Sequence, residues 1–201
     1  KRRIIMEFQS GVIYQAYIKS FNDTDGNGIG DLKGITEKIP YLAKLGIEMI
    51  WINPFYPSPQ NDNGYDIADY YGIDPLFGTM ADFDEMIRVG KEHNIGIMME
   101  LAINHTSTEH EWFQKALAGD EDYQDYYILR EAPAGQEFPT NWESKFGGPA
   151  WEPFGQTGKF YLSLFDPTQA DLNWRNPKVR EEAAKVVNFW MDKGVKGFRL
   201  D

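Results

Sequence analysis

Short apolar segments that alternate with segments of helical periodicity constrain the fold of this 201-residue chain more than any other feature. The strand-like segments are rich in β-branched and aromatic residues, and they occupy residues 12–17, 49–52, 95–103 and 195–200. Strands that alternate with helices pair in parallel and are joined by right-handed crossovers. The sequence therefore predicts an α/β fold, which is either an open doubly wound sheet or the first half of an eight-stranded barrel.

The first predicted helix follows a loop that ends near residue 31. Ile35, Ile39 and Leu42 recur in it at helical spacing. Because proline cannot donate the backbone hydrogen bond of a helix interior, Pro40 predicts either a kink or two short helices. Gly46 follows the periodic residues and predicts the C-terminal end of the helix.

The other two predicted helices have signals at both ends. Thr79 and Asp82 have the spacing of a capping box, and Asn94 suits the left-handed conformation that ends a helix. Asn176-Pro177 supplies the N-cap and the first residue of the last helix, and Gly194 ends it. One helix therefore precedes the third strand, and the other precedes the fourth.

Periodicity is lost between residues 104 and 174, where aromatic residues, glycine, proline and strand-like pieces such as Phe160–Phe165 predominate. About seventy residues are far more than an ordinary connection between a strand and a helix needs. We therefore expect an inserted subdomain over residues 104–174, which divides the α/β domain into residues 1–103 and 175–201.

Composition excludes several classes of partner. The net charge of −11 argues against nucleic acid, whose phosphates require clustered lysine and arginine. The chain has no cysteine, and no apolar run reaches the length of a membrane span. The apolar stretch after Lys1-Arg2-Arg3 is too short for an export signal, and the acidity fits a cytoplasmic protein. The aromatic content of 15% fits either a large core or a sugar-binding cleft.

The loop after the first strand places oxygen-bearing side chains at alternate positions. Gly28 lies where a calcium loop turns, so the segment matches the first nine positions of an EF-hand loop. Gly34 replaces the glutamate of the twelfth position, which excludes a complete EF-hand. Hard oxygen ligands favour Ca²⁺ or Mg²⁺, although a solvated turn has a similar composition. The candidate ligands are Asp23, Asp25, Asn27, the carbonyl of Ile29, and Asp31.

Two segments that follow predicted strands contain polar groups suited to a sugar site. Asp62-Asn63-Gly64-Tyr65-Asp66 combines a ring that can stack on a sugar with carboxylates that can accept its hydroxyl hydrogens. Asn104-His105 follows the third strand at the same end. In a barrel, the loops after the strands open onto the active-site face. Taken alone, the first segment is also explained as a turn, and the second as a structural histidine.

Gly197-Phe198-Arg199-Leu200-Asp201 ends the fourth strand with a guanidinium and a carboxylate two residues apart. Side chains two residues apart in a strand point to the same side. Arg199 would keep Asp201 ionised and oriented, so that Asp201 can attack as a nucleophile. The alternative is that Asp201 is the N-cap of a following helix.

The order and placement of these motifs resemble glycoside hydrolase family 13, the α-amylase superfamily, from about residue 11 to Asp201. Within that family, the chain is similar to the oligo-1,6-glucosidase subgroup. The segments that support the resemblance are Tyr14-Gln15 with Ser20-Phe21, the acidic loop to Asp31, residues 62–66, Asn104-His105-Thr106-Ser107, Gln169-Ala170-Asp171-Leu172-Asn173-Trp174 and Gly197-Phe198-Arg199-Leu200-Asp201.

The resemblance implies that the chain is the N-terminal half of a TIM barrel, with residues 104–174 as domain B. Asp201 would form a covalent glucosyl-enzyme, and Arg199 would hold it. The loop of residues 23–31 would hold a structural Ca²⁺ or Mg²⁺ ion. Asp62 and His105 would bind hydroxyls of the glucose. Tyr65 would stack on the sugar ring, and Phe165 would form part of the pocket wall.

A retaining glycosidase needs a second carboxyl group as its acid. The resemblance implies a glutamate after a fifth strand, which is absent from this chain. We therefore expect the segment alone to be inactive and unstable, since half a barrel leaves a sheet edge unpaired.

The resemblance implies a retaining α-glucosidase that acts on a small carbohydrate. Ser58-Pro59-Gln60 and residues 139–148 are similar to enzymes that hydrolyse trehalose-6-phosphate to glucose and glucose-6-phosphate. The alternatives are an enzyme for neutral malto- or isomalto-oligosaccharides and a non-catalytic relative.

The chain departs from the family pattern at several positions. Glu100 stands where the strand-three acid is usually aspartate, which puts its reach to Arg199 in doubt. Ile18-Lys19 replaces the usual Pro-Arg, Ala170 a usual proline, and Ser163 a frequent histidine. These departures indicate a divergent member.

Overall fold

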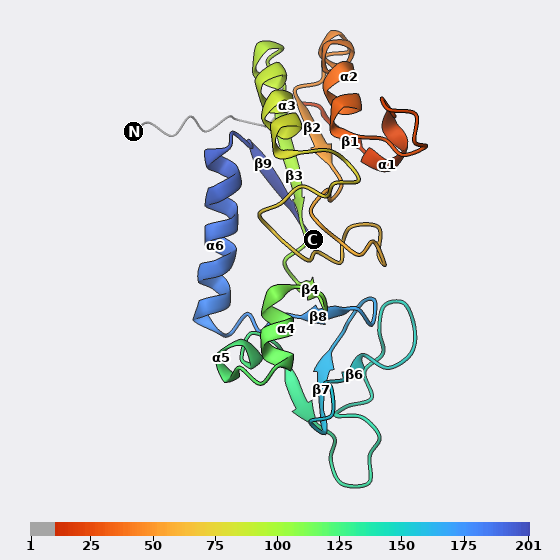
Figure 1. Cartoon of the computed structure of the whole chain (residues 1–201), viewed down its shortest axis with the longest axis vertical. Helices are drawn as coiled ribbons and strands as arrows, with labels where there is room; N and C mark the ends of the chain where they lie inside the picture. Colours follow the sequence, from red (N-terminus) through yellow and green to blue (C-terminus); the bar gives the residue numbers. More distant parts are fainter. Residues whose placement is uncertain (1–10) are drawn as a thin grey trace. The chain divides into compact units, whose positions relative to one another are not determined.

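Figure 1 shows the computed structural model of the chain, which describes residues 11–201. These residues form two compact units. The first holds the described residues up to Asn53, Pro75–Glu100 and Met191–Arg199, and the second holds Pro54–Asp74, Leu101–Trp190 and Leu200–Asp201. The expectation about an export signal concerns the first six residues and lies outside the described part of the chain.

A parallel four-stranded sheet forms the centre of the first unit. Its strands are β1 (Ile13–Ala16), β2 (Met49–Ile52), β3 (Gly96–Leu101) and β9 (Gly197–Leu200), in the order β1-β2-β3-β9. Strands β1, β2 and β3 pair in parallel. The backbone N–H of Lys196 donates to the carbonyl of Ile97, and that of Asp201 donates to Leu101, so β9 runs in the same direction. The predicted α/β class is confirmed.

The helices of the first unit are α1 (Ile18–Phe21), α2 (Leu32–Lys44) and α3 (Met80–Glu92). Helix α2 continues through Pro40, so the prediction of two short helices is wrong. Ile35 and Ile39 before the proline and Leu42 after it are all buried. Burial of this apolar face on both sides of Pro40 outweighs the loss of one backbone hydrogen bond.

The predicted helix ends are confirmed. Thr79 and Asp82 form a capping box at the start of α3. Gly46 after α2 and Asn94 after α3 adopt left-handed conformations, with φ of 82° and 56°. Each is followed by a backbone bond across the last turn, such as that from Ile47 N–H to the carbonyl of Leu42 (3.1 Å), as in a Schellman motif. These ends direct the chain into β2 and β3.

The second unit contains two small antiparallel sheets. Strands β4 (His105–Ser107) and β8 (Gln169–Asp171) form one, and β5 (Leu129–Glu131), β7 (Lys159–Leu162) and β6 (Trp151–Pro153) form the other in that order. The unit also contains α4 (Glu111–Leu117), α5 (Glu121–Gln124) and most of α6 (Pro177–Asp192). Helix α6 begins as predicted, since the Asn176 side chain accepts the N–H of Lys178 (2.9 Å).

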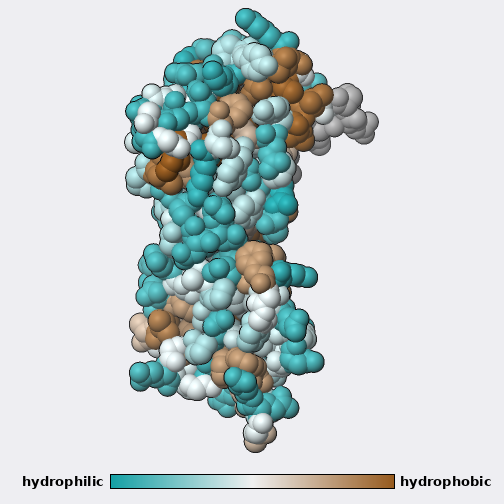
Figure 2. Space-filling model, turned by 90° about the vertical axis from the view of Figure 1, so that its right-hand side faces the viewer, coloured by the Kyte–Doolittle hydropathy of each residue, from teal (hydrophilic) through white to brown (hydrophobic). Residues whose placement is uncertain are grey.

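Aromatic residues occur both in the core and at the surface. Trp151 and Trp190 are buried, whereas 55% of Trp142 is exposed. Hydrophilic residues predominate on the face in Figure 2, and apolar residues form small separate patches. Among the described residues, the helices lack the length and apolarity that a membrane crossing requires.

Candidate functional site

The loop between β2 and α3 is folded around one buried carboxylate, that of Asp66. It accepts hydrogen bonds from the Ser58 hydroxyl (2.9 Å) and from the backbone N–H groups of Asn61 (2.8 Å) and Asp62 (3.1 Å). Asp66 is fully buried, so these bonds satisfy a charge that would otherwise be costly. They fix the course of the backbone that presents Asp62 and Tyr65.

Asp62 and Tyr65 lie at the two ends of a tight turn. The N–H of Tyr65 donates to the carbonyl of Asp62 (3.0 Å), and the central residues Asn63 and Gly64 have φ of 51° and 96°. Two positive φ angles are typical of a type I′ turn, which favours Asn-Gly. A Cβ at Gly64 would also lie 2.9 Å from the carbonyl oxygen of Pro54. The turn offered as the alternative reading is therefore present, and it brings the candidate carboxylate and ring together.

The Asp62 carboxylate accepts a hydrogen bond from the side-chain amide of Gln169 (2.9 Å). Burial raises the pKa of Asp62, the Gln169 bond lowers it, and the charges of Asp66, Asp166 and Asp201 raise it further. Asp62 therefore lies in an acidic environment, where the uncharged amide favours its ionised form.

His105 lies at the start of β4 and is almost fully buried. Its Nε2 lies 3.0 Å from the carbonyl oxygen of Tyr65, and its Nδ1 lies 3.3 Å from the amide nitrogen of Asn104. Because a carbonyl can only accept, Nε2 carries the hydrogen and Nδ1 accepts. Burial lowers the pKa of His105, while the bond to Tyr65 and the charges of Asp201 and Asp66 raise it. A neutral imidazole fits all these contacts.

Two further side chains contact His105 or its neighbour. The Phe165 ring lies 5.4 Å from the His105 ring, centroid to centroid. The Asp171 carboxylate accepts from the Asn104 amide (2.8 Å) and from the N–H of Leu164 (2.8 Å). Burial raises the pKa of Asp171 to about 6. A hydrogen-bonded chain thus leads from Asp171 through Asn104 to the imidazole.

Asp201 belongs to the same compact unit as Asp62, Tyr65, His105 and Phe165. Its backbone N–H donates to the carbonyl of Leu101 (3.4 Å), and its charge acts on the pKa of both Asp62 and His105. Five of the six residues predicted for catalysis and sugar binding therefore lie within one unit.

Arg199, the sixth, belongs to the first unit together with Glu100 and Trp51. Glu100 is fully buried; its Oε1 accepts from the Arg199 guanidinium (2.7 Å) and its Oε2 from the Trp51 indole N–H (2.8 Å). The guanidinium also lies 5.4 Å from the centroid of the Trp51 ring. The longer side chain of Glu100 therefore does reach Arg199.

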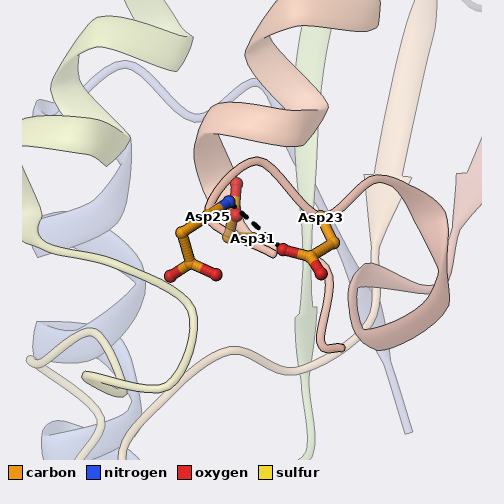
Figure 3. A group of neighbouring side chains, drawn as sticks. All are labelled: Asp23, Asp25 and Asp31. Atoms are coloured by element: carbon orange, nitrogen blue, oxygen red, sulfur yellow. Dashed lines mark hydrogen bonds between the residues drawn. The ribbon is translucent and has the colours of Figure 1, made fainter. Parts of the chain in front are cut away.

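Asp23, Asp25 and Asp31 converge in the loop before α2 (Figure 3), where each offers a carboxylate oxygen within 4.8 Å of the others. Asp31 also caps α2 by accepting the N–H of Gly34 (2.6 Å). The bond that Asp23 accepts from the N–H of Gly28 is the largest cause that lowers its pKa. Three carboxylate groups at this spacing suit a hard cation.

Asn27, a fourth predicted ligand, forms hydrogen bonds with Asp25 and the backbone of Ile29. The Asn27 side-chain oxygen accepts the N–H of Ile29 (2.8 Å), and its amide donates to Asp25 (3.0 Å). The side chains of Asn27 and Ile29 are exposed and half-buried. The structure therefore brings the three aspartates together and places the Asn27 side chain against Asp25.

Gln169, Asp171 and Asp66 have contacts at the site that sequence reasoning did not assign. All three lay within segments already singled out, but their partners are distant in sequence: Gln169 and Asp62 are separated by 107 positions.

Comparison with known proteins gives one family and several similar enzymes. The family model described as "Alpha amylase, catalytic domain" matches residues 15–201. The chain is 51% identical over 195 residues to the trehalose-6-phosphate hydrolase of Bacillus subtilis (strain 168). It is 50% identical over 195 residues to the oligo-1,6-glucosidase of Parageobacillus thermoglucosidasius. Each alignment covers 96% of this chain.

Solved structures agree in fold. The crystal structure of Bacillus licheniformis trehalose-6-phosphate hydrolase matches with a TM-score of 0.94 and 52% identity, over 97% of this chain and 35% of that chain. The chain also spans only 35% and 34% of the two curated relatives, about a third of their length. The parallel sheet and these matches give the chain a TIM-barrel-type α/β fold.

Proposed function

Because this chain belongs to the α-amylase catalytic-domain family, we propose that the complete protein hydrolyses α-glucosidic bonds with retention of configuration. One observation supports this most: a single compact unit contains Asp62, His105 and Asp201, and the charge of Asp201 acts on the other two. Retaining hydrolysis needs an ionised carboxylate beside groups that bind the sugar hydroxyls.

In the proposed mechanism, Asp201 attacks the anomeric carbon and forms a covalent glucosyl-enzyme, which water then hydrolyses. Arg199 keeps Asp201 ionised, and Glu100 in turn fixes the guanidinium. Asp62 and His105 bind hydroxyls of the glucose. We assign the general acid to no residue of this chain.

The remaining contacts shape the glucose pocket. Tyr65 stacks on the sugar ring, and its carbonyl holds the imidazole of His105. Phe165 packs near that imidazole and walls the pocket. The sugar is thus oriented by one carboxylate, one imidazole and two rings.

The proposed substrate is trehalose-6-phosphate, with neutral isomalto- or malto-oligosaccharides as the alternative. Relatives named for the two activities are 51% and 50% identical to this chain, so identity alone does not separate them. The segments 58–60 and 139–148 favour the phosphorylated disaccharide.

The experiment compares hydrolysis of trehalose-6-phosphate, trehalose and isomaltose by the longest natural polypeptide that contains this sequence. We expect turnover of trehalose-6-phosphate to fall sharply when the phosphate is removed. The variant Asp201→Asn should lose roughly a thousandfold or more in kcat, as loss of a nucleophile does. Preference for isomaltose would favour the alternative, and an active Asp201→Asn variant would contradict the mechanism.

We also propose that the loop of residues 23–31 binds a structural Ca²⁺ or Mg²⁺ ion. Convergence of three carboxylates, near the N-terminus of α2, supports this. The ion would neutralise the mutual repulsion of these carboxylates. Its ligands would be Asp23, Asp25, Asn27, the carbonyl of Ile29, and Asp31.

Residues 104–174 are proposed to form domain B, inserted between residues 1–103 and 175–201 of domain A. A separate aromatic core supports this: the Phe113 ring lies 5.1 Å from that of Tyr127, 5.6 Å from Phe154 and 5.1 Å from Tyr161.

The proposed phosphorylated substrate, which cells retain in the cytoplasm, supports a cytoplasmic location. Recovery of the protein from the culture medium, and not from the cytoplasmic fraction of the cells, would contradict this location.

A further inference from the structure

The Gln169 side chain bridges two loops of the second unit. Gln169 is fully buried at the start of β8. Its amide nitrogen donates to an Asp62 carboxylate oxygen (2.9 Å), and its amide oxygen accepts the backbone N–H of Asp166 (2.8 Å). Because a backbone N–H can only donate, the amide oxygen must face Asp166, and the NH₂ group must face Asp62. The second contact therefore fixes the orientation of the first.

The backbone of Gln169 is held as well. Its N–H donates to the carbonyl of Asp166 (2.8 Å), and the same carbonyl accepts the Ser163 hydroxyl (2.7 Å). Strand β8 pairs Gln169 with Ser107 of β4. A side chain fixed at its backbone and at both atoms of its amide has little rotational freedom, so it can act as a rigid support for Asp62.

The charge around Asp62 explains why an uncharged donor suits this position. Three carboxylates act on Asp62: Asp66 from the same loop, Asp166 from the loop before β8, and Asp201 after β9. All three disfavour its ionised form, which is the form that accepts hydroxyl hydrogens. The amide favours that form, and it leaves the negative charge of Asp62 available for a sugar.

We propose that Gln169 is a positioning residue, which fixes the orientation and the ionised state of the Asp62 carboxylate so that it can bind a glucose hydroxyl. This inference rests on the proposed function, since it assigns a task to Asp62 in that site. Gln169 itself does not contact the reacting atoms.

The test uses the longest natural polypeptide that contains this sequence and an aryl α-glucoside as substrate. Gln169→Met keeps a similar length but removes both the donor to Asp62 and the acceptor of the Asp166 N–H. We expect kcat/KM to fall about tenfold to a hundredfold, as for loss of a hydrogen bond to a charged group. The acidic limb of the kcat/KM profile should also move to higher pH, because the pKa of Asp62 rises further without the amide.

A second variant separates positioning from packing. Gln169→Glu preserves the shape of the side chain but places a carboxylate against Asp62. At neutral pH, we expect kcat/KM to fall at least as much as for Gln169→Met. Partial recovery should follow on acidification, when the introduced carboxyl is protonated and can donate again. A purely structural role would produce no such recovery.

The matched control is Gln124→Met in the same unit, where the amide donates to the carbonyl of Ala116 (3.1 Å). It should change neither kcat/KM nor the pH profile. If Gln169→Met lowers only the melting temperature and leaves both kinetic readouts unchanged, the positioning role is wrong. A wild-type polypeptide without turnover of any α-glucoside would instead overturn the proposed function itself.

Discussion

Glu100 illustrates how much a single buried charge depends on its partners. Both of its carboxylate oxygens are hydrogen-bonded, one by Arg199 and the other by Trp51. Removal of one partner from a buried ion pair costs about 3–5 kcal/mol, whereas exposed pairs contribute about 0–1 kcal/mol. The pair is therefore expected to matter for both stability and the orientation of Arg199.

The first prediction concerns Glu100→Gln. Because the uncharged side chain leaves the guanidinium without its charged partner, and because the Arg199 side chain is 38% exposed and can be solvated, we expect the free energy of unfolding to fall by about 1–2 kcal/mol and kcat to fall with it. Glu100→Asp restores the usual acid but is one methylene shorter, so it should keep the charge and lose one of the two bonds. Denaturant unfolding and steady-state kinetics of the complete polypeptide measure both effects.

The control is Asp84→Asn, which removes an exposed ion pair between Asp84 and Lys193 (3.1 Å) in the same unit. This substitution should change the free energy of unfolding by no more than about 0.5 kcal/mol. Equal stability of Glu100→Gln and Asp84→Asn would show that the buried pair has no special importance.

His110 gives a pH prediction. It caps α4, where its Nδ1 accepts the N–H of Trp112 (3.1 Å), and burial lowers its pKa from 6.5 to about 4. In the unfolded chain, His110 binds a proton below pH 6.5 that the folded chain does not bind. Its contribution is therefore fully present above pH 6.5 and is lost as the pH falls toward 4, by about 3 kcal/mol in total.

Histidine NMR tests this directly, since the His110 imidazole should stay neutral until about pH 4. Comparison with His110→Gln cancels the effects of the other titrating groups on the pH dependence of stability. Asp171, for example, has a raised pKa, so its contribution to stability increases as the pH falls. The stability difference between wild type and variant should shrink as the medium is acidified. An imidazole that titrates near 6.5 would contradict the prediction.

Single residues also show where sequence reasoning ends. The tight turn and the pairing of Asp62 with Tyr65 follow from local chemistry, because Asn-Gly favours this turn. The bond between Gln169 and Asp62 could not be predicted, because it joins positions 107 residues apart. Its existence depends on the packing of β8, which no local pattern specifies.

Among the elements, the junction between the acidic loop and the first turn of α2 has little room for added side chains at two glycines. A Cβ at Gly30 would lie 2.0 Å from the carbonyl oxygen of Ile18, and one at Gly34 would lie 2.0 Å from that of Asn22. The backbone N–H of Gly30 donates to the carbonyl of Lys19 (2.8 Å), and that of Asp31 donates to the carbonyl of Asn22 (3.1 Å), so the end of the acidic loop is held against α1. The three aspartates are thereby kept close together despite their like charges.

The acidic loop should make the stability of the complete polypeptide depend on a divalent metal ion. Removal of divalent ions with a chelator should lower the melting temperature of the complete polypeptide, and added Ca²⁺ or Mg²⁺ should restore it by mass action. Asp25→Asn should weaken this response. Glu121→Gln, on the exposed surface of α5, is the charge-matched control and should leave it intact. A melting temperature that changes neither with the chelator nor with the added ion would exclude the metal site.

Helix ends were the most predictable elements, since Thr79 with Asp82, Gly46 and Asn94 act through bonds within a few residues. Of the two alternatives at Pro40, that of two short helices was wrong, because α2 is held by burial of its apolar face and not by its backbone bonds alone. The short α4 and α5 were missed, since helices of seven and four residues are too short to show a period.

At the scale of the whole molecule, strand order was predictable, but the second unit was not. Parallel strands separated by helices imply that successive strands are neighbours, and β1, β2, β3 and β9 follow that order. Between residues 104 and 174, packing depends on rings such as Phe113 and Tyr161, which meet across 48 positions (161 − 113). Such contacts leave no local pattern.

The edges of the four-stranded sheet give the prediction at this scale. In the described part of the chain, β1 and β9 are its outer strands. Unpaired sheet edges template association with other chains. The 201-residue segment expressed alone should therefore self-associate in light scattering and show no turnover. A monomeric, active segment would contradict this.

The position of β9 in the sheet has a consequence for the order of events during folding. Met49 of β2 pairs with Ile13 of β1 and with Gly96 of β3, which are 36 and 47 positions away (49 − 13 and 96 − 49), whereas Arg199 meets Glu100 across 99 positions. Closure of so long a loop is slow, because its entropy is lost before its contacts form. Strand β9, which contains Arg199 and precedes Asp201, should thus join the sheet last. A folding intermediate without β9 would be compact but would lack the proposed nucleophile at its site. Pulse-labelled hydrogen exchange during refolding should accordingly show β9 amides protected after those of β2.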